Sequence, residues 1–108
     1  MAALGGGTGS VSARRGAGRG SVVVTMAGEL DMSNAPVLSG VVAPLLDNPE
    51  VVEIVFDMSA LAFMDSSVLA VLVKAAASGK AVRLRRPGPV VREVIEVTGL
   101  AGVLRCEP

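Results

Sequence analysis

The segment that decides the fold is VVEIVFD, residues 51–57. All of its residues except Glu53 and Asp57 are apolar, and most are β-branched, which is typical of a strand buried on both faces. The turn-forming residues 47–49, Asp-Asn-Pro, precede it. These features predict a central strand of a parallel sheet that helices cover.

The residues before this strand predict a second strand and a helix. Residues 21–26, SVVVTM, form a short β-branched run that we expect to end in a turn at residues 27–28. Ser33 or Asn34 then caps a helix in which apolar residues recur at helical spacing through residue 46. Pro44 should kink this helix or end it early, because its ring presses on the preceding turn.

The residues after the central strand repeat the alternation. Residues 68–77 form an apolar block of helical length, and residues 81–85 alternate as a strand near an edge of the sheet. Pro89 opens a last helix that Gly99 ends, and residues 103–104 could add a short final element.

Together these elements predict the α/β class, as a small open sheet of mainly parallel strands with helices packed on it. Residues 1–20 are rich in Gly, Ser and Arg and hold few apolar side chains, so we expect a flexible N-terminal tail. The folded domain should span residues 21–108.

Composition excludes several function classes. The net charge is zero, but the first 20 residues carry +3 and the rest has 7 basic against 10 acidic residues, which argues against a nucleic-acid surface. Lys74 interrupts the longest apolar run, so we expect no membrane insertion. Cys106 is the only cysteine, which is typical of a reducing compartment and predicts a cytoplasmic protein.

This chain contains few of the residue types that enzymes use for catalysis. Without histidine, and with one cysteine, neither a zinc site nor a Ser-His-Asp triad can be assembled. Asp31, Asp57 and Asp65 could converge at strand ends on a divalent cation, although turn formation and helix capping explain such aspartates more simply. We therefore predict no enzyme activity, no cofactor and no metal.

The sequence Asp65-Ser66-Ser67 stands directly before the apolar block. Capping by Asp65 or Ser66 explains one polar residue, but it explains three less well. A hydroxyl at a helix start is accessible, and a phosphate there meets free backbone N–H groups and the positive end of the helix dipole. Ser66 is therefore a candidate phosphorylation site.

The helix behind these residues has an unusual outer face. Leu69, Leu72, Val73 and Ala76 form the expected core stripe. The opposite face combines hydroxyls with Ala70, Val71 and Lys74 where a charged stripe is the norm. This composition predicts that another protein covers Ala70, Val71 and Lys74, and burial in a larger sheet is the competing explanation.

Four segments of the chain, in this order, resemble the STAS domain family of sulfate transporters and anti-sigma factor antagonists. They are Gly28-Glu29-Leu30-Asp31, Asp57-Met58-Ser59, Phe63-Met64-Asp65-Ser66-Ser67, and Val91-Arg92-Glu93-Val94 with Thr98-Gly99-Leu100. The resemblance covers about residues 21–104. The family usually has glycine after the second hydroxyl, and this chain has Val68 there.

The resemblance implies a non-enzymatic protein-binding switch, an anti-sigma factor antagonist. Ser66 matches the serine that a partner phosphorylates, a partner that is both anti-sigma factor and serine kinase of the histidine-kinase-like ATPase class. Free Ser66 would permit binding and so release a sigma factor, with Asp65, Ser67, Val68 and Asp31 around the phosphorylation site.

Two alternatives remain. One is a STAS subunit of a larger assembly, such as a lipid-transport complex, that uses the same helix face without phosphorylation. The other, a small nucleotide-handling enzyme, lacks a phosphate-binding loop.

Overall fold

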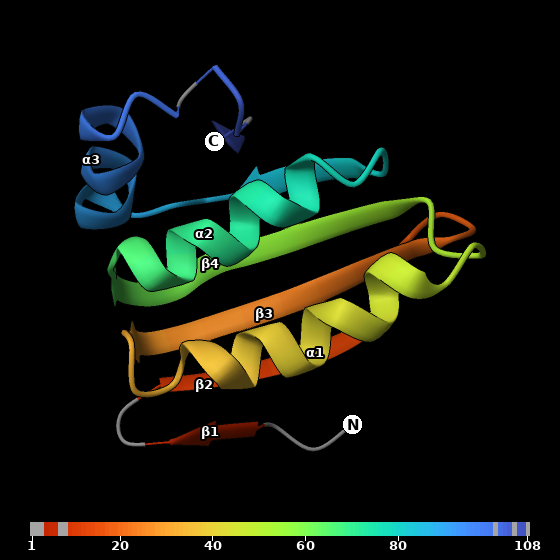
Figure 1. The fold of residues 1–108 in the computed structure, drawn as a ribbon, viewed down its shortest axis with the longest axis horizontal. Coiled ribbons are helices and arrows are strands. Elements are labelled where there is room, and N and C mark those ends of the chain that lie inside the picture. The colour runs from red at the N-terminus through yellow and green to blue at the C-terminus, as the bar shows by residue number, and fades with distance from the viewer. Residues whose placement is uncertain (1–3, 7–8, 101, 105, 108) are drawn as a thin grey trace.

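The structure is a computed structural model that describes residues 4–6, 9–100, 102–104 and 106–107 (Figure 1). These residues form one six-stranded sheet in the order β1-β2-β3-β4-β5-β6. Helices α1 and α2 lie side by side across one face of the sheet (Figure 1). The strands are β1 (Leu4–Gly6), β2 (Gly9–Arg15), β3 (Ser21–Leu30), β4 (Glu53–Met64), β5 (Ala81–Arg85) and β6 (Cys106–Glu107), and the helices are α1 (Ala35–Asp47), α2 (Ser66–Ala76) and α3 (Pro89–Val97).

The centre of the sheet is parallel, as the sequence predicts. Strands β3, β4 and β5 run in one direction, with Val24 opposite Phe56 and Phe56 opposite Leu84. These three side chains are fully buried and belong to the core beneath the helices. Strands β1 and β2 are antiparallel additions. The α/β fold class is therefore confirmed.

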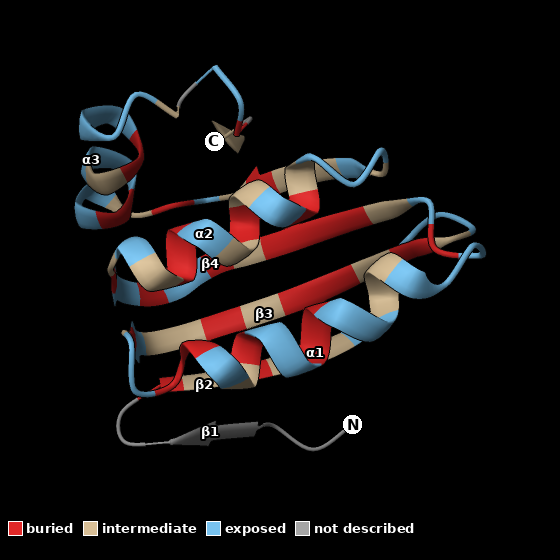
Figure 2. Ribbon diagram, in the orientation of Figure 1, coloured by how far each residue is buried: buried red, intermediate tan, exposed pale blue. Residues whose placement is uncertain are grey.

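The core lies between the sheet and the helices. Buried and exposed residues alternate along α1 and α2, so that each helix turns one apolar stripe to the strands (Figure 2). The stripes consist of Ala35, Leu38, Val41 and Val42 in α1 and of Val68, Leu69, Leu72 and Ala75 in α2. Aliphatic side chains thus make up most of this core, and Phe56 is the one aromatic ring among the buried residues that the structure describes.

The N-terminal segment differs from the flexible tail expected for residues 1–20. Residues 9–15 form β2, which pairs with β3 and places Val11 in the core with 1% exposure. Pairing with β3 provides hydrogen-bond partners for the backbone N–H and C=O groups of this segment. The composition of the segment gave no sign of this pairing. Residues 1–3 and 7–8 of the expected tail lie outside the described residues.

Both central strands are longer than predicted. Strand β3 does not stop at the expected turn but continues through Gly28, where φ is +76° and the pairing with β4 shifts register. Glycine adopts this backbone conformation without strain, so the irregularity behaves as a bulge in a continuing strand. Strand β4 likewise extends to Met64. Because both strands are extended, their carboxyl ends lie next to each other at one end of the sheet.

An early end of the first helix at Pro44 and a short final element at residues 103–104 do not occur. Helix α1 does not end early at Pro44 but continues to Asp47, and Leu45 and Leu46 beyond the proline pack against the core. Residues 103–104 lie in a turn, and the last strand is β6 instead.

The predicted end of α3 is confirmed. Gly99 has a φ of +75° and donates its N–H to the carbonyl of Glu96, and the N–H of Leu100 reaches the carbonyl of Ile95. This pattern of paired bonds is a Schellman motif, which satisfies carbonyls that the helix end leaves open.

Candidate functional site

Two aspartates meet where β3 and β4 end. Leu30 and Met64 are register partners at the carboxyl ends of these parallel strands, and Asp31 and Asp65 follow them directly. Each aspartate opens the turn that leads into a helix, Asp31 before α1 and Asp65 before α2. The two carboxylates are near enough that the charge of Asp65 raises the pKa of Asp31 in part.

Asp65 is the N-cap of α2, one of the two residues predicted for that role. Its Oδ1 accepts the backbone N–H of Ser67 at 3.0 Å and the Ser67 hydroxyl at 2.5 Å. The Ser67 hydroxyl is the main reason that the pKa of Asp65 lies below its usual value. The carboxylate is therefore ionised at neutral pH and holds the first turn of the helix.

Asp31 makes the same kind of turn. Its Oδ1 accepts the hydroxyl of Ser33 at 2.6 Å and the Ser33 backbone N–H at 2.9 Å, and these bonds lower the pKa of Asp31. Asn34, only 3% exposed, ties the turn to β3, because its Oδ1 accepts the N–H of Asp31 and its Nδ2 donates to the carbonyl of Glu29. Sequence reasoning considered Asn34 only as a possible cap.

The two hydroxyls after Asp65 have different surroundings. The Ser67 hydroxyl is engaged with the Asp65 carboxylate. Ser66 is exposed, and its hydroxyl makes no hydrogen bond with any described residue. The carboxylate of Asp65 thus positions Ser67 rather than Ser66, and Ser66 offers the accessible oxygen.

Two large apolar side chains flank this acidic site. Met32 is 76% exposed and Phe63 is 40% exposed, in a chain whose other large apolar residues are mostly buried. The backbone N–H of Met32 also helps to lower the pKa of Asp65, which places the Met32 backbone next to that carboxylate. Sequence reasoning missed Met32, although an apolar residue between Asp31 and Ser33 was a visible signal.

The third aspartate does not join the other two. Asp57 lies within β4, opposite Thr25 and Arg85, and accepts the hydroxyl of Ser59 at 2.8 Å. Burial acts to raise the pKa of Asp57, but Ser59 and the nearby arginine charges outweigh it and the pKa is lowered. Within the described residues no group of three or more His, Cys, Asp and Glu could hold a metal ion.

The three residues of α2 that were predicted to bind a partner differ in their exposure to solvent. Ala70 and Lys74 are exposed, whereas Val71 is half-buried and packs against the core. Val73 and Ala76, expected in the core stripe, are half-buried as well. Val68 is 0% exposed, so the residue that stands in place of the usual glycine is part of the core.

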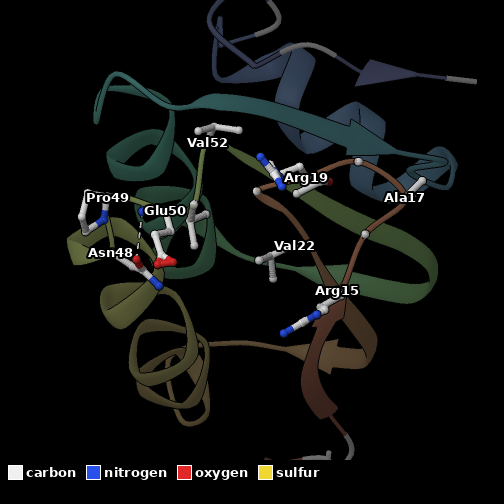
Figure 3. A pocket seen from close by; sticks show the side chains of 13 residues that line it. Arg15, Ala17, Arg19, Val22, Asn48, Pro49, Glu50 and Val52 are labelled. Carbon is white, nitrogen blue, oxygen red and sulfur yellow. Dashed lines mark hydrogen bonds between the residues drawn. The ribbon is translucent and has the colours of Figure 1, made fainter.

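A broad hollow of about 1080 Å³ lies at the opposite end of the sheet, between residues 15–22 and 48–52. Arg15, Arg19 and Glu50 lie around it (Figure 3). It opens where β3 begins, whereas Asp31 and Ser66 lie beyond the strand end, about 30 Å away for ten residues at ~3.3 Å each. The hollow therefore contains none of the residues assigned to the site.

Comparison with protein families identifies the chain. A family model described as "Mlab, STAS domain" matches residues 13–105, and the protein therefore belongs to the STAS domain family. No curated protein matches the sequence.

Solved structures of the same fold include three informative cases. The anti-sigma factor antagonist SpoIIAA in its unphosphorylated form has a TM-score of 0.77 at 22% identity, over 91% of this chain and 88% of that chain. An anti-sigma factor antagonist from Mycobacterium paratuberculosis has a TM-score of 0.78 at 26% identity, over 92% and 86%. SLC26A9 gives 0.70 at 19% identity over 83% of this chain, which corresponds to 18% of that larger protein.

No helix in the described part of the chain is both long and apolar enough to cross a membrane.

Proposed function

We propose that this protein is an anti-sigma factor antagonist that is switched by phosphorylation of Ser66. One observation carries the proposal. Of the two adjacent hydroxyls at the start of α2, Ser66 is exposed and free of hydrogen bonds to the described residues, and Ser67 is held by Asp65. A kinase that reaches this helix start therefore finds one hydroxyl ready to accept a phosphate.

The charges around Ser66 explain how a phosphate would act. It adds about −1.5 to −2 charges beside Asp65 and Asp31, both already ionised. The helix start tolerates this charge through its dipole and its backbone N–H groups. Lys74 on the same helix is eight residues away, about 12 Å at 1.5 Å per residue, too far to pair with the phosphate. The added charge thus acts on the partner and leaves the fold intact.

The proposed partner is an anti-sigma factor and serine kinase of the histidine-kinase-like ATPase class. It docks on Ser66 and on Ala70, Val71 and Lys74 of α2, and free Ser66 permits the complex that releases a sigma factor. The protein itself performs no catalysis, and because its partner consumes ATP it acts in the cytoplasm.

Similar proteins support this proposal. SpoIIAA is known in an unphosphorylated and in a phosphorylated form, so a STAS domain of this shape accommodates the phosphate. The M. paratuberculosis neighbour is also an anti-sigma factor antagonist.

A second candidate function is a constitutive STAS subunit of a larger assembly, such as a lipid-transport complex. Its specific support is Val68, which fills the core where the family usually has glycine. The similarity to part of SLC26A9 shows that this fold also occurs inside a much larger protein.

The affinity of the partner separates the two candidates. Histidine-kinase-like ATPases of the same genome would be purified and titrated by calorimetry with wild type, Ser66→Asp and Ser66→Asn. We expect Ser66→Asn to bind like wild type and Ser66→Asp to bind at least about tenfold more weakly, because only the aspartate must lose water from a charge at the interface. Equal affinity of all three variants would support the constitutive subunit.

A further inference from the structure

A shallow groove runs between α1 and α2 on the side of the helices that faces away from the sheet. It encloses a hollow of about 60 Å³ whose lining is Ser39, Val42, Ala43 and Leu46 from α1 and Val71 and Lys74 from α2. Val42 is buried in the core below, while Ser39, Ala43 and Lys74 are exposed at the mouth. The hollow is therefore aliphatic at its base and open to solvent.

The surface around the groove carries very little charge. Lys74 is the only charged residue of α2, and Asp47, at the last position, is the only one of α1. Helix α3, of nine residues, contains Arg92, Glu93 and Glu96. Lys74 forms no hydrogen bond or ion pair with any residue that the structure describes. An unpaired ammonium group thus stands at the mouth of an uncharged, aliphatic hollow.

We propose that this groove binds one helix of the anti-sigma factor, which places a small aliphatic side chain in the hollow and a carboxylate against Lys74. The inference rests on the proposed function and extends its docking surface from α2 onto α1. Small residues at the mouth, Ser39 and Ala43, allow a third helix to approach closely, and the aliphatic base accepts an apolar side chain. The unpaired Lys74 ammonium favours a partner that carries a carboxylate at this point.

The groove is continuous with the phosphorylation site. Ser66, Ala70 and Lys74 are exposed at i, i+4 and i+8 and form one stripe along α2. A partner that covers Ser66 therefore reaches Lys74 within about 12 Å. The sequence pattern alone could not show that α1 completes this surface, because it did not reveal which side of α2 faces α1.

The test uses the purified histidine-kinase-like ATPase that phosphorylates Ser66. Its affinity would be measured for wild type, Ala43→Arg, Lys74→Glu and the matched control Ala17→Arg, whose exposed alanine lies in the β2–β3 loop at the other end of the sheet. Because Ala43 and Lys74 are exposed, both variants should keep the thermal stability of wild type. We expect Ala43→Arg and Lys74→Glu to weaken binding at least about tenfold, and Ala17→Arg to bind like wild type.

The outcomes separate the groove from the switch. Suppose that Ser66→Asp weakens binding of the ATPase but Ala43→Arg and Lys74→Glu do not. The groove inference is then wrong, and the proposed function stands. If no such ATPase phosphorylates Ser66, the proposed function fails, and the groove inference that rests on it fails as well. The loss for Lys74→Glu should shrink at high salt, and a loss independent of salt would contradict the acidic partner. If wild type self-associates and Ala43→Arg does not, a second copy of the chain occupies the groove and the inference is overturned.

Discussion

Val68→Gly should destabilise the protein strongly, although glycine is the residue that the STAS pattern usually has at this position. The Val68 side chain is 0% exposed and lies in the core under the first turn of α2. Removing its three carbons costs about 2.4 kcal/mol at ~0.8 kcal/mol each. Glycine in place of valine in a helix costs roughly another 0.5 kcal/mol. The free energy of unfolding should therefore fall by about 3 kcal/mol.

Urea denaturation followed by circular dichroism measures this loss, with Val68→Ala as the control. Val68→Ala loses two carbons, about 1.6 kcal/mol, but regains roughly 0.6 kcal/mol because alanine is the better helix former, so the net loss should be about 1 kcal/mol. If Val68→Gly stays within about 1 kcal/mol of wild type, Val68 does not pack as described and the burial argument is wrong.

Three further predictions concern the two aspartates and the first strands. Asp65→Ala should lose about 1 kcal/mol of stability in urea, whereas Asp65→Asn should lose only a few tenths; equal losses would show that capping is not the role of this side chain. The folded pKa values of Asp31 and Asp65 are lowered, so the stability they contribute is present above the ordinary pKa of about 3.9 and is lost as the pH falls through the folded values. The melting temperature, measured from pH 7 to pH 3, should therefore decline below about pH 4, and this decline should be smaller in the double variant Asp31→Asn, Asp65→Asn. An equal decline in both proteins would show that these two carboxylates do not cause it. Trypsin should cut first after Arg19, in an exposed loop, and later after Arg14, which lies in β2 and donates to the Thr25 hydroxyl at 2.7 Å; a first cut at Arg14 would contradict the pairing of β2.

Parts of the fold with a complete local signal could be predicted from the sequence. Strand β5 matches the expected residues 81–85 because its alternation is bounded by turn residues on both sides. Helix α3 ends as expected because Gly99 and Leu100 specify the Schellman bonds themselves.

Other parts depend on contacts between distant residues. Strand β2 has Val11 as its buried anchor, and it exists because β3 offers a partner edge, which composition cannot reveal. The continuation of β3 past Gly28 depends on pairing with β4 in the same way. Local patterns therefore underestimated the sheet at its N-terminal side.

The sequence indicates which polar residues stand at the start of α2, but not which hydrogen bonds they form. The order Asp65-Ser66-Ser67 before an apolar helix indicated an accessible hydroxyl and a cap. Side-chain rotamers at the helix start decide whether the Ser66 or the Ser67 hydroxyl donates to the Asp65 carboxylate. In the structure it is the Ser67 hydroxyl. The closeness of Asp31 to Asp65 depends on the register of Leu30 with Met64, which only the assembled sheet defines.

The most direct test of the central claim is to locate the phosphate that the partner transfers. Wild type, Ser66→Ala and Ser67→Ala would each be incubated with the purified histidine-kinase-like ATPase and Mg-ATP, and the products analysed by mass spectrometry of the intact protein and its fragments. We predict a single phosphate on Ser66 in wild type and in Ser67→Ala, and none in Ser66→Ala, since Ser66 offers the free hydroxyl. A phosphate on Ser67, or no phosphate on either serine while the ATPase binds wild type and Ser66→Asp equally well, would contradict the switch.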